Sequence, residues 1–181
     1  HKYGLYLFLD GARLGYGLAA PDNDLTLPDI AALCDVFYIG GTKVGALFGE
    51  AVVIKNPELA QDFRYLIKQN GGMLAKGRLL GLQFDALFTD GLYQEISAHA
   101  IAMAEKLREA FTAKGYNYLA PNRTNQIFVI VPDAHLAKIS EQFEYSYDQR
   151  IDATRSCVRF CTGWATREEN VDALIRCVEK L

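Results

Sequence analysis

Apolar runs and helical patterns alternate along the first half of the chain. Leu5–Leu9 and Val36–Ile39 are short continuous apolar runs, which are typical of parallel strands covered on both faces. Between them, Thr26 followed by proline and aspartate predicts a capped helix that runs to about Cys34. Ala46–Ile54 predicts a third strand. We expect it to be antiparallel, because the connection before it is too short for a helical crossover.

Helical patterns dominate the middle of the chain. Asn56-Pro57-Glu58 predicts the start of a helix that ends at Asn70-Gly71-Gly72. Met73–Phe88 is apolar on most sides, which predicts a helix buried between domains or subunits. Thr89-Asp90-Gly91 breaks it, and Leu92–Lys114 then predicts a long amphipathic helix closed by a glycine. Its expected inward positions are Ile96, Met103, Leu107 and Phe111, and its expected outward positions are Glu105, Lys106, Arg108 and Glu109.

The last third of the chain predicts a second, smaller α/β region. Gln126–Val131 is a strand pattern, and Pro132-Asp133 starts a short helix. Tyr145–Tyr147 and Cys157–Thr162 are further strand candidates, and Thr166–Glu169 resembles a capping box that opens the final helix. The sequence therefore predicts an α/β protein with a parallel piece and a small, mainly antiparallel piece. The boundary between them should lie along the long helix.

Composition and charge exclude several classes of function. The chain has 181 residues, half of them hydrophobic, and a formal charge of −3 without long charged runs. A nucleic-acid partner is therefore not expected, and no apolar run reaches the roughly 18 residues of a membrane span. The four cysteines lack metal-ligand spacing, so we interpret them as reduced thiols of a cytoplasmic protein. The abrupt start in a strand suggests the C-terminal portion of a longer protein.

Two residues at predicted strand ends are candidates for chemistry. Lys43 follows an apolar strand and two glycines, Gly40 and Gly41, which permit a bend and close approach to a bound group. A lysine held in a partly apolar place can become a nucleophilic amine; the alternative is an ordinary lysine on a surface turn. Asp10 directly follows the first strand, where ligands of open α/β sheets gather; the alternative is a turn aspartate before glycine.

Two arginines are candidates for anion binding. Arg13 lies three residues after Asp10, and its planar guanidinium suits a carboxylate or phosphate; the alternative is a solvated arginine. Arg159 lies within an apolar strand, on the face opposite Val158 and Phe160, so its partner is either a structural acid or a bound anion. The order of these features fits a site in which lysine binds an aldehyde cofactor covalently and aspartate supports the cofactor's ring nitrogen.

Four motifs resemble the low-specificity threonine aldolase branch of the β-eliminating lyases, which are pyridoxal-phosphate (PLP) enzymes of the aspartate-aminotransferase fold. They occur in the family's order over nearly the whole chain: Phe8–Leu14 (FLDGARL), Gly41–Ala46 (GTKVGA), Gly71–Met73 (GGM) and Arg159–Ala165 (RFCTGWA). The resemblance implies that Lys43 binds PLP covalently and that Asp10 pairs with its pyridine nitrogen. It implies that Arg13 and Arg159 hold the carboxylate of an amino acid substrate, and that Arg13 also belongs to the cofactor-binding residues.

The resemblance also implies a domain division and an assembly. Residues 1–92 would be part of the PLP-binding large domain, whose N-terminal half is absent, and residues 93–181 the small C-terminal domain with the linking helix. The absent half would supply the phosphate-binding loop, the aromatic residue stacked on the cofactor and a histidine near the substrate hydroxyl. We expect a homodimer or homotetramer that cleaves threonine to glycine and acetaldehyde. The alternatives are another PLP-dependent lyase, racemase or aminotransferase, and a non-catalytic structural fragment; the chain alone should be inactive.

Overall fold

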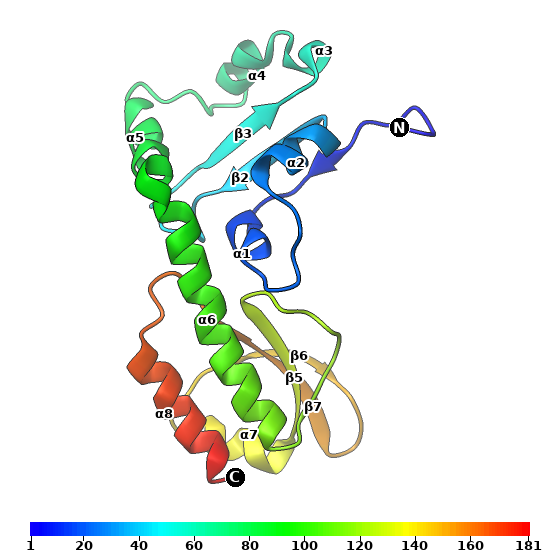
Figure 1. Ribbon diagram of the computed structural model, residues 1–181, viewed down its shortest axis with the longest axis vertical. Coiled ribbons are helices and arrows are strands. Elements are labelled where there is room, and N and C mark those ends of the chain that lie inside the picture. Colours follow the sequence, from blue (N-terminus) through cyan, green and yellow to red (C-terminus); the bar gives the residue numbers. More distant parts are fainter. The chain divides into compact units, whose positions relative to one another are not determined.

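The computed structural model describes residues 1–181, which form two compact units (Figure 1). The first unit contains His1–Leu18 and Asn23–Ile96, and the second contains Ala19–Asp22 and Ser97–Leu181. The division falls inside the long helix α6, Leu92–Ala113. None of the helices combines the length and the apolar character that a membrane crossing requires.

The first unit contains a three-stranded sheet in the order β1-β2-β3. β1 (Phe8–Leu9) runs parallel to β2 (Val36–Gly40), and β2 runs antiparallel to β3 (Glu50–Ile54). The direction predicted for the third strand is thus confirmed, although the strand begins four residues later than expected.

The first strand is shorter and more exposed than its apolar run predicted. Only Phe8 and Leu9 pair with β2. Leu7 donates its backbone N–H to the Asp35 carboxylate at 2.8 Å, while its carbonyl accepts from the backbone N–H groups of Asp35 and Val36 at 3.0 and 3.3 Å. Phe8 is 60% exposed and Leu9 is half-buried, so the two-residue strand is at most partly covered, and on one face only, within this chain. The prediction of a doubly covered strand is therefore wrong for the chain as it stands.

The helices of the first unit follow the sequence pattern in part. α1 (Leu14–Leu18) was not predicted, whereas α2 (Leu27–Leu33) has a capping box between Thr26 and Asp29. The single helix expected after Asn56 is instead two helices, α3 (Pro57–Ala60) and α4 (Phe63–Gln69). Asp62 separates them because its φ of 57° is left-handed and cannot continue a helix.

The apolar segment before the long helix forms α5, Arg78–Phe88, which begins five residues later than predicted. Leu87 is its only buried residue, and Leu79 is 57% exposed, so the predicted burial is not met within this chain. A 3-10 turn, η1 (Thr89–Gly91), separates α5 from α6, as the sequence indicated. Asp90 takes a left-handed φ of 52° there.

The second unit packs helices against an antiparallel sheet of four strands. The sheet order is β4-β5-β7-β6, formed by Asn117–Tyr118, Gln126–Pro132, Arg155–Cys161 and Ser146–Arg150. α7 (Asp133–Ile139) and α8 (Glu168–Glu179) join α6 around the core, together with the inward strand positions. The expected inward residues of α6 from Met103 onward belong to this core, whose apolar members are Met103, Ala104, Leu107, Phe111, Ile127, Val129, Val131, Leu136, Ile139, Val158, Phe160, Val171, Leu174 and Val178.

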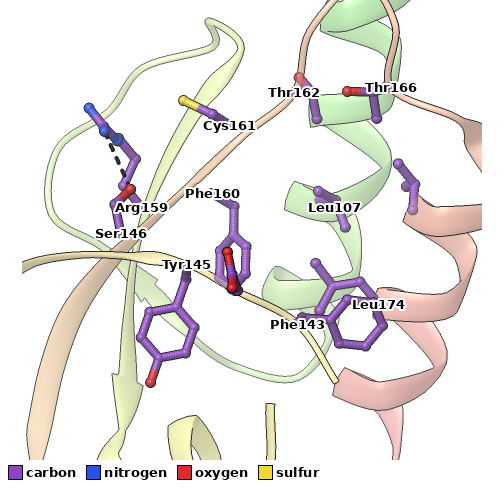
Figure 2. A pocket seen from close by; sticks show the side chains of 12 residues that line it. Leu107, Phe143, Tyr145, Ser146, Arg159, Phe160, Cys161, Thr162, Thr166 and Leu174 are labelled. Atoms are coloured by element: carbon purple, nitrogen blue, oxygen red, sulfur yellow. Dashed lines mark hydrogen bonds between the residues drawn. The ribbon is translucent and has the colours of Figure 1, made fainter. Parts of the chain in front are cut away.

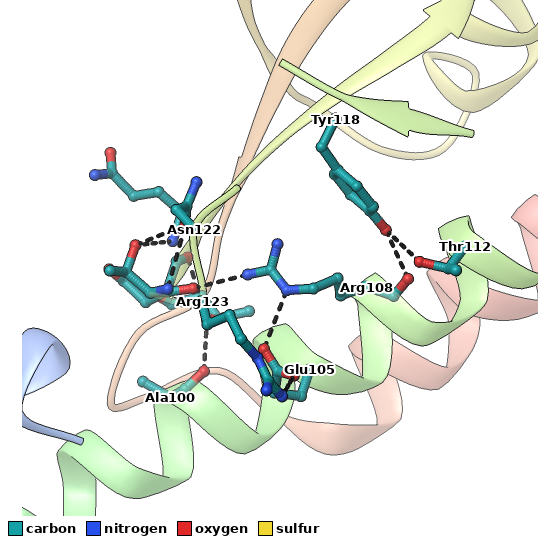
Figure 3. A network of polar contacts seen from close by, with 11 residues as sticks. Ala100, Glu105, Arg108, Thr112, Tyr118, Asn122 and Arg123 are labelled. Carbon is teal, nitrogen blue, oxygen red and sulfur yellow. Dashed lines mark hydrogen bonds and ion pairs between the residues drawn. The ribbon is translucent and has the colours of Figure 1, made fainter. Parts of the chain in front are cut away.

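Two local predictions for the second unit are wrong. The cap of α8 is Arg167, not Thr166, because the Thr166 hydroxyl instead accepts a hydrogen bond from the Gly163 backbone at 2.8 Å. Glu105 and Arg108 are largely buried rather than outward, since Arg108 also donates to the Thr124 carbonyl at 3.1 Å (Figure 3). Burial alone would raise the pKa of Glu105, but hydrogen bonds from Arg123 and Arg108 lower it below its ordinary value.

Candidate functional site

Asp10 and Lys43 follow the ends of two parallel, directly paired strands in the first unit. Asp10 comes immediately after β1, and Lys43 lies in the turn after β2. The two strand exits touch, because the Gly40 backbone N–H donates to the Gly11 carbonyl at 2.9 Å. Parallel strands point their carboxyl ends to the same edge of a sheet, so the loops that carry the two residues are neighbours.

Glycines make this close approach possible. A Cβ at Gly11 would lie 1.7 Å from the Tyr38 carbonyl oxygen, and one at Gly40 would lie 2.4 Å from the Ala12 carbonyl oxygen. The sequence had suggested that Gly40 and Gly41 leave room for a bound group. Their space is instead occupied by the chain itself, since Gly41 faces the Phe84 ring. The glycines therefore set the distance between the two loops.

Two buried tyrosines fix these loops. The Tyr93 hydroxyl donates to the Gly40 carbonyl at 2.9 Å and accepts from the Gly15 backbone N–H at 3.1 Å. The Tyr16 hydroxyl donates to the backbone carbonyl of Lys43. Sequence reasoning missed both, because a tyrosine in an apolar helical position gives no sign of the distant backbone group that it will bind.

Asp10 is held as a carboxylate by its surroundings. A hydrogen bond from the Tyr38 hydroxyl is the main cause that lowers the pKa of Asp10, followed by the bond from the Ala12 backbone N–H at 3.1 Å. Partial desolvation acts in the opposite direction, and the charges of Lys43 and Arg13 lower the pKa further. Both cations therefore lie within electrostatic reach of Asp10.

The two cations themselves are available to a ligand. Lys43 is exposed and Arg13 is half-buried, and neither side chain donates a hydrogen bond within the chain. The partly apolar surroundings that the sequence suggested for Lys43 are not found, although the next residue, Val44, is completely buried. The arrangement presents one anion and two cations at a single sheet edge.

Arg159 belongs to the second unit, where it lies on β7 between two neighbouring strands. Its guanidinium donates to the Gln126 amide oxygen of β5 at 3.2 Å. It also donates to the Ser146 hydroxyl of β6 at 3.4 Å (Figure 2). The Nε atom is buried without a partner. The sequence left two partners open for Arg159, a structural acid or a bound anion. No acidic side chain pairs with Arg159 in the structure. A pocket of about 380 Å³ adjoins Arg159 and is walled by apolar side chains such as Leu107 and Phe160.

The chain is similar to threonine aldolases in sequence and in structure. It is 31% identical over 177 residues to the low-specificity L-threonine aldolase of Pseudomonas sp. (strain NCIMB 10558), covering 96% of this chain and 49% of that protein. The corresponding Pseudomonas aeruginosa protein is 29% identical, with 97% and 50% covered. The solved structure of Leishmania major threonine aldolase superposes with a TM-score of 0.96 at 42% identity and covers 99% of this chain and 52% of that one. No protein-family model matches, and the chain spans about half the length of these relatives.

Proposed function

We propose, on the premise that the chain belongs to the low-specificity L-threonine aldolase family, that it forms part of a PLP-dependent lyase that cleaves β-hydroxy amino acids. Its fold is that of the fold-type I PLP enzymes, over about half of their length. The observation that carries the proposal is the meeting of Asp10 and Lys43 at adjoining ends of β1 and β2, in a chain so similar to a threonine aldolase.

The residues at this sheet edge fit the proposed cofactor. An ionised carboxylate, Asp10, suits a protonated ring nitrogen, because a charge-assisted hydrogen bond is stronger than a neutral one. Lys43 offers an exposed primary amine, which is the group that reacts with an aldehyde. When bound, PLP supplies an electron-withdrawing ring that stabilises negative charge at the substrate's Cα.

The chain's arginines are proposed to bind the substrate carboxylate. Arg159 supports this role because its two neutral partners leave its positive charge uncompensated. Arg13 adds a cation beside Asp10. A bound carboxylate would orient threonine so that the Cα–Cβ bond breaks to give glycine and acetaldehyde. The hydroxyl proton would be taken by a base outside these four residues.

Assembly and location are further parts of the proposal. The exposed leucines of α5 support a homodimer or homotetramer, because apolar side chains at this density favour burial against a partner. The four free cysteines support a cytoplasmic location. We also propose that the 181-residue chain is inactive alone, because it spans only half of its relatives.

Product analysis tests the reaction. The protein expressed from its complete reading frame should release acetaldehyde and glycine from L-threonine, and Lys43→Ala should abolish this release. Lys68→Ala, which removes an exposed lysine in the last turn of α4, is the matched control and should keep it. Pyruvate from serine, a D-amino acid or a keto acid as the main product would instead assign another PLP reaction. No turnover of any amino acid by the wild type would favour the structural role.

A further inference from the structure

Tyr38 contacts the proposed cofactor aspartate from the neighbouring strand. The Tyr38 hydroxyl donates a hydrogen bond to Oδ1 of Asp10, and the Ala12 backbone N–H donates to the same oxygen at 3.1 Å. Oδ2 of Asp10 receives no hydrogen bond from the chain. One carboxylate oxygen is therefore bound by two donors, while the other is left for a ligand.

The position of Tyr38 follows from the register of the sheet. Its neighbours Phe37 and Ile39 are buried on one face of β2, so alternation puts Tyr38 on the other face. Phe8 of β1 pairs with Val36, so its ring lies diagonally beside Tyr38, with 6.2 Å between the ring centroids. The Tyr38 ring therefore packs beside Phe8 on this face of the sheet, and its hydroxyl reaches Asp10 at the end of β1.

We propose that Tyr38 is a positioning residue of the cofactor site, which fixes Oδ1 of Asp10 and so presents Oδ2 to the ring nitrogen of PLP. This inference rests on the proposed function. Tyr38 acts through Asp10.

The electrostatics of the pair agree with this role. The Tyr38 hydrogen bond is the largest cause of the lowered pKa of Asp10, and it raises the pKa of the Tyr38 phenol in return. The Glu50 charge raises the phenol pKa further. At neutral pH the phenol therefore keeps its proton and remains a donor, and Asp10 remains an acceptor. Lys43 and Arg13 are the other charges that act on Asp10, and both favour its ionised form.

Two measurements on Tyr38→Phe separate positioning from simple packing, because phenylalanine keeps the ring beside Phe8. In the 181-residue chain, a carbon-13 NMR titration should give a higher carboxyl pKa for Asp10 than in the wild type. Tyr6→Phe removes a hydroxyl that contacts Glu58 at 3.4 Å instead, so it should leave the Asp10 pKa unchanged. An unchanged Asp10 pKa in Tyr38→Phe would overturn the inference.

The second measurement is the affinity for PLP of the protein expressed from its complete reading frame. Tyr38→Phe should weaken it about threefold to tenfold, which corresponds to the loss of one hydrogen bond. Equal affinity in both proteins would refute Tyr38 as a positioning residue while leaving the proposed function intact. A wild type that binds no PLP would refute the proposed function itself and, with it, Tyr38 as a positioning residue of a PLP site.

Discussion

Tyr93 is the residue whose removal should most directly disturb the two candidate loops. Tyr93→Phe deletes one hydroxyl and leaves two backbone groups without their partner, the Gly40 carbonyl and the Gly15 N–H. Both glycines are buried, and Tyr93 is only 1% exposed, so water cannot easily replace the lost bonds. We expect a loss of about 1–3 kcal/mol in the free energy of unfolding of the first unit, the cost of unsatisfied buried polar groups.

The assay must report on the first unit by itself, because a chain of two units need not unfold in one step. Native-state hydrogen exchange of the β2 amides measures the opening free energy of this unit. Tyr147→Phe, a 62% exposed site on β6, is the matched control and should change nothing. If the opening free energy of the β2 amides in Tyr93→Phe is within about 0.5 kcal/mol of the wild-type value, the Tyr93 hydroxyl does not stabilise these loops.

Three further experiments test an ionisation and two other contacts of the chain. Burial raises the pKa of Tyr93 from 10 to about 12. Because the unfolded chain releases this proton near pH 10, the free energy of unfolding of the first unit should fall by up to about 2–3 kcal/mol between pH 10 and pH 12. An equal fall in Tyr93→Phe over the same pH range would contradict this. Gly11→Ala should destabilise the first unit by about 1–3 kcal/mol in urea unfolding, because its Cβ would overlap a carbonyl oxygen, whereas Gly17→Ala has open space and should be tolerated. Gln126→Glu gives the Arg159 guanidinium an acidic partner, which would compete with the substrate carboxylate. KM for threonine should therefore rise about tenfold with little change in kcat. An unchanged KM would show that Arg159 does not bind the carboxylate.

Local signals in the sequence predicted the local structure well. The β2 and β3 strands, the Thr26 cap of α2 and the break at Thr89–Gly91 follow from patterns within a few residues. The kink at Asp62 was missed, because an aspartate in the left-handed region has no distinctive sequence context. The burial of β1 on both faces was also predicted wrongly. An apolar run shows that a strand has apolar side chains to bury, but not whether other parts of the chain cover them.

The site could be predicted only as a set of residue types at strand ends. Asp10 and Lys43 were found because each follows an apolar strand and because the motifs around them resemble a family. Tyr38 and Tyr93 were not found, since their partners lie 28 and 53 residues away in sequence. Contacts between residues so far apart in the sequence arise from the packing of strands and helices. The residues around each partner carry no local signal of them.

The covalent attachment of PLP to Lys43 is the most direct test of the account. The protein expressed from its complete reading frame is incubated with PLP, reduced with borohydride and digested, and the peptides are weighed by mass spectrometry. We expect a phosphopyridoxyl mass increment on the peptide that contains Lys43 and a markedly weaker one in Asp10→Ala, which lacks the carboxylate proposed to bind the ring nitrogen. An increment on another lysine, or none in the wild type, would contradict it.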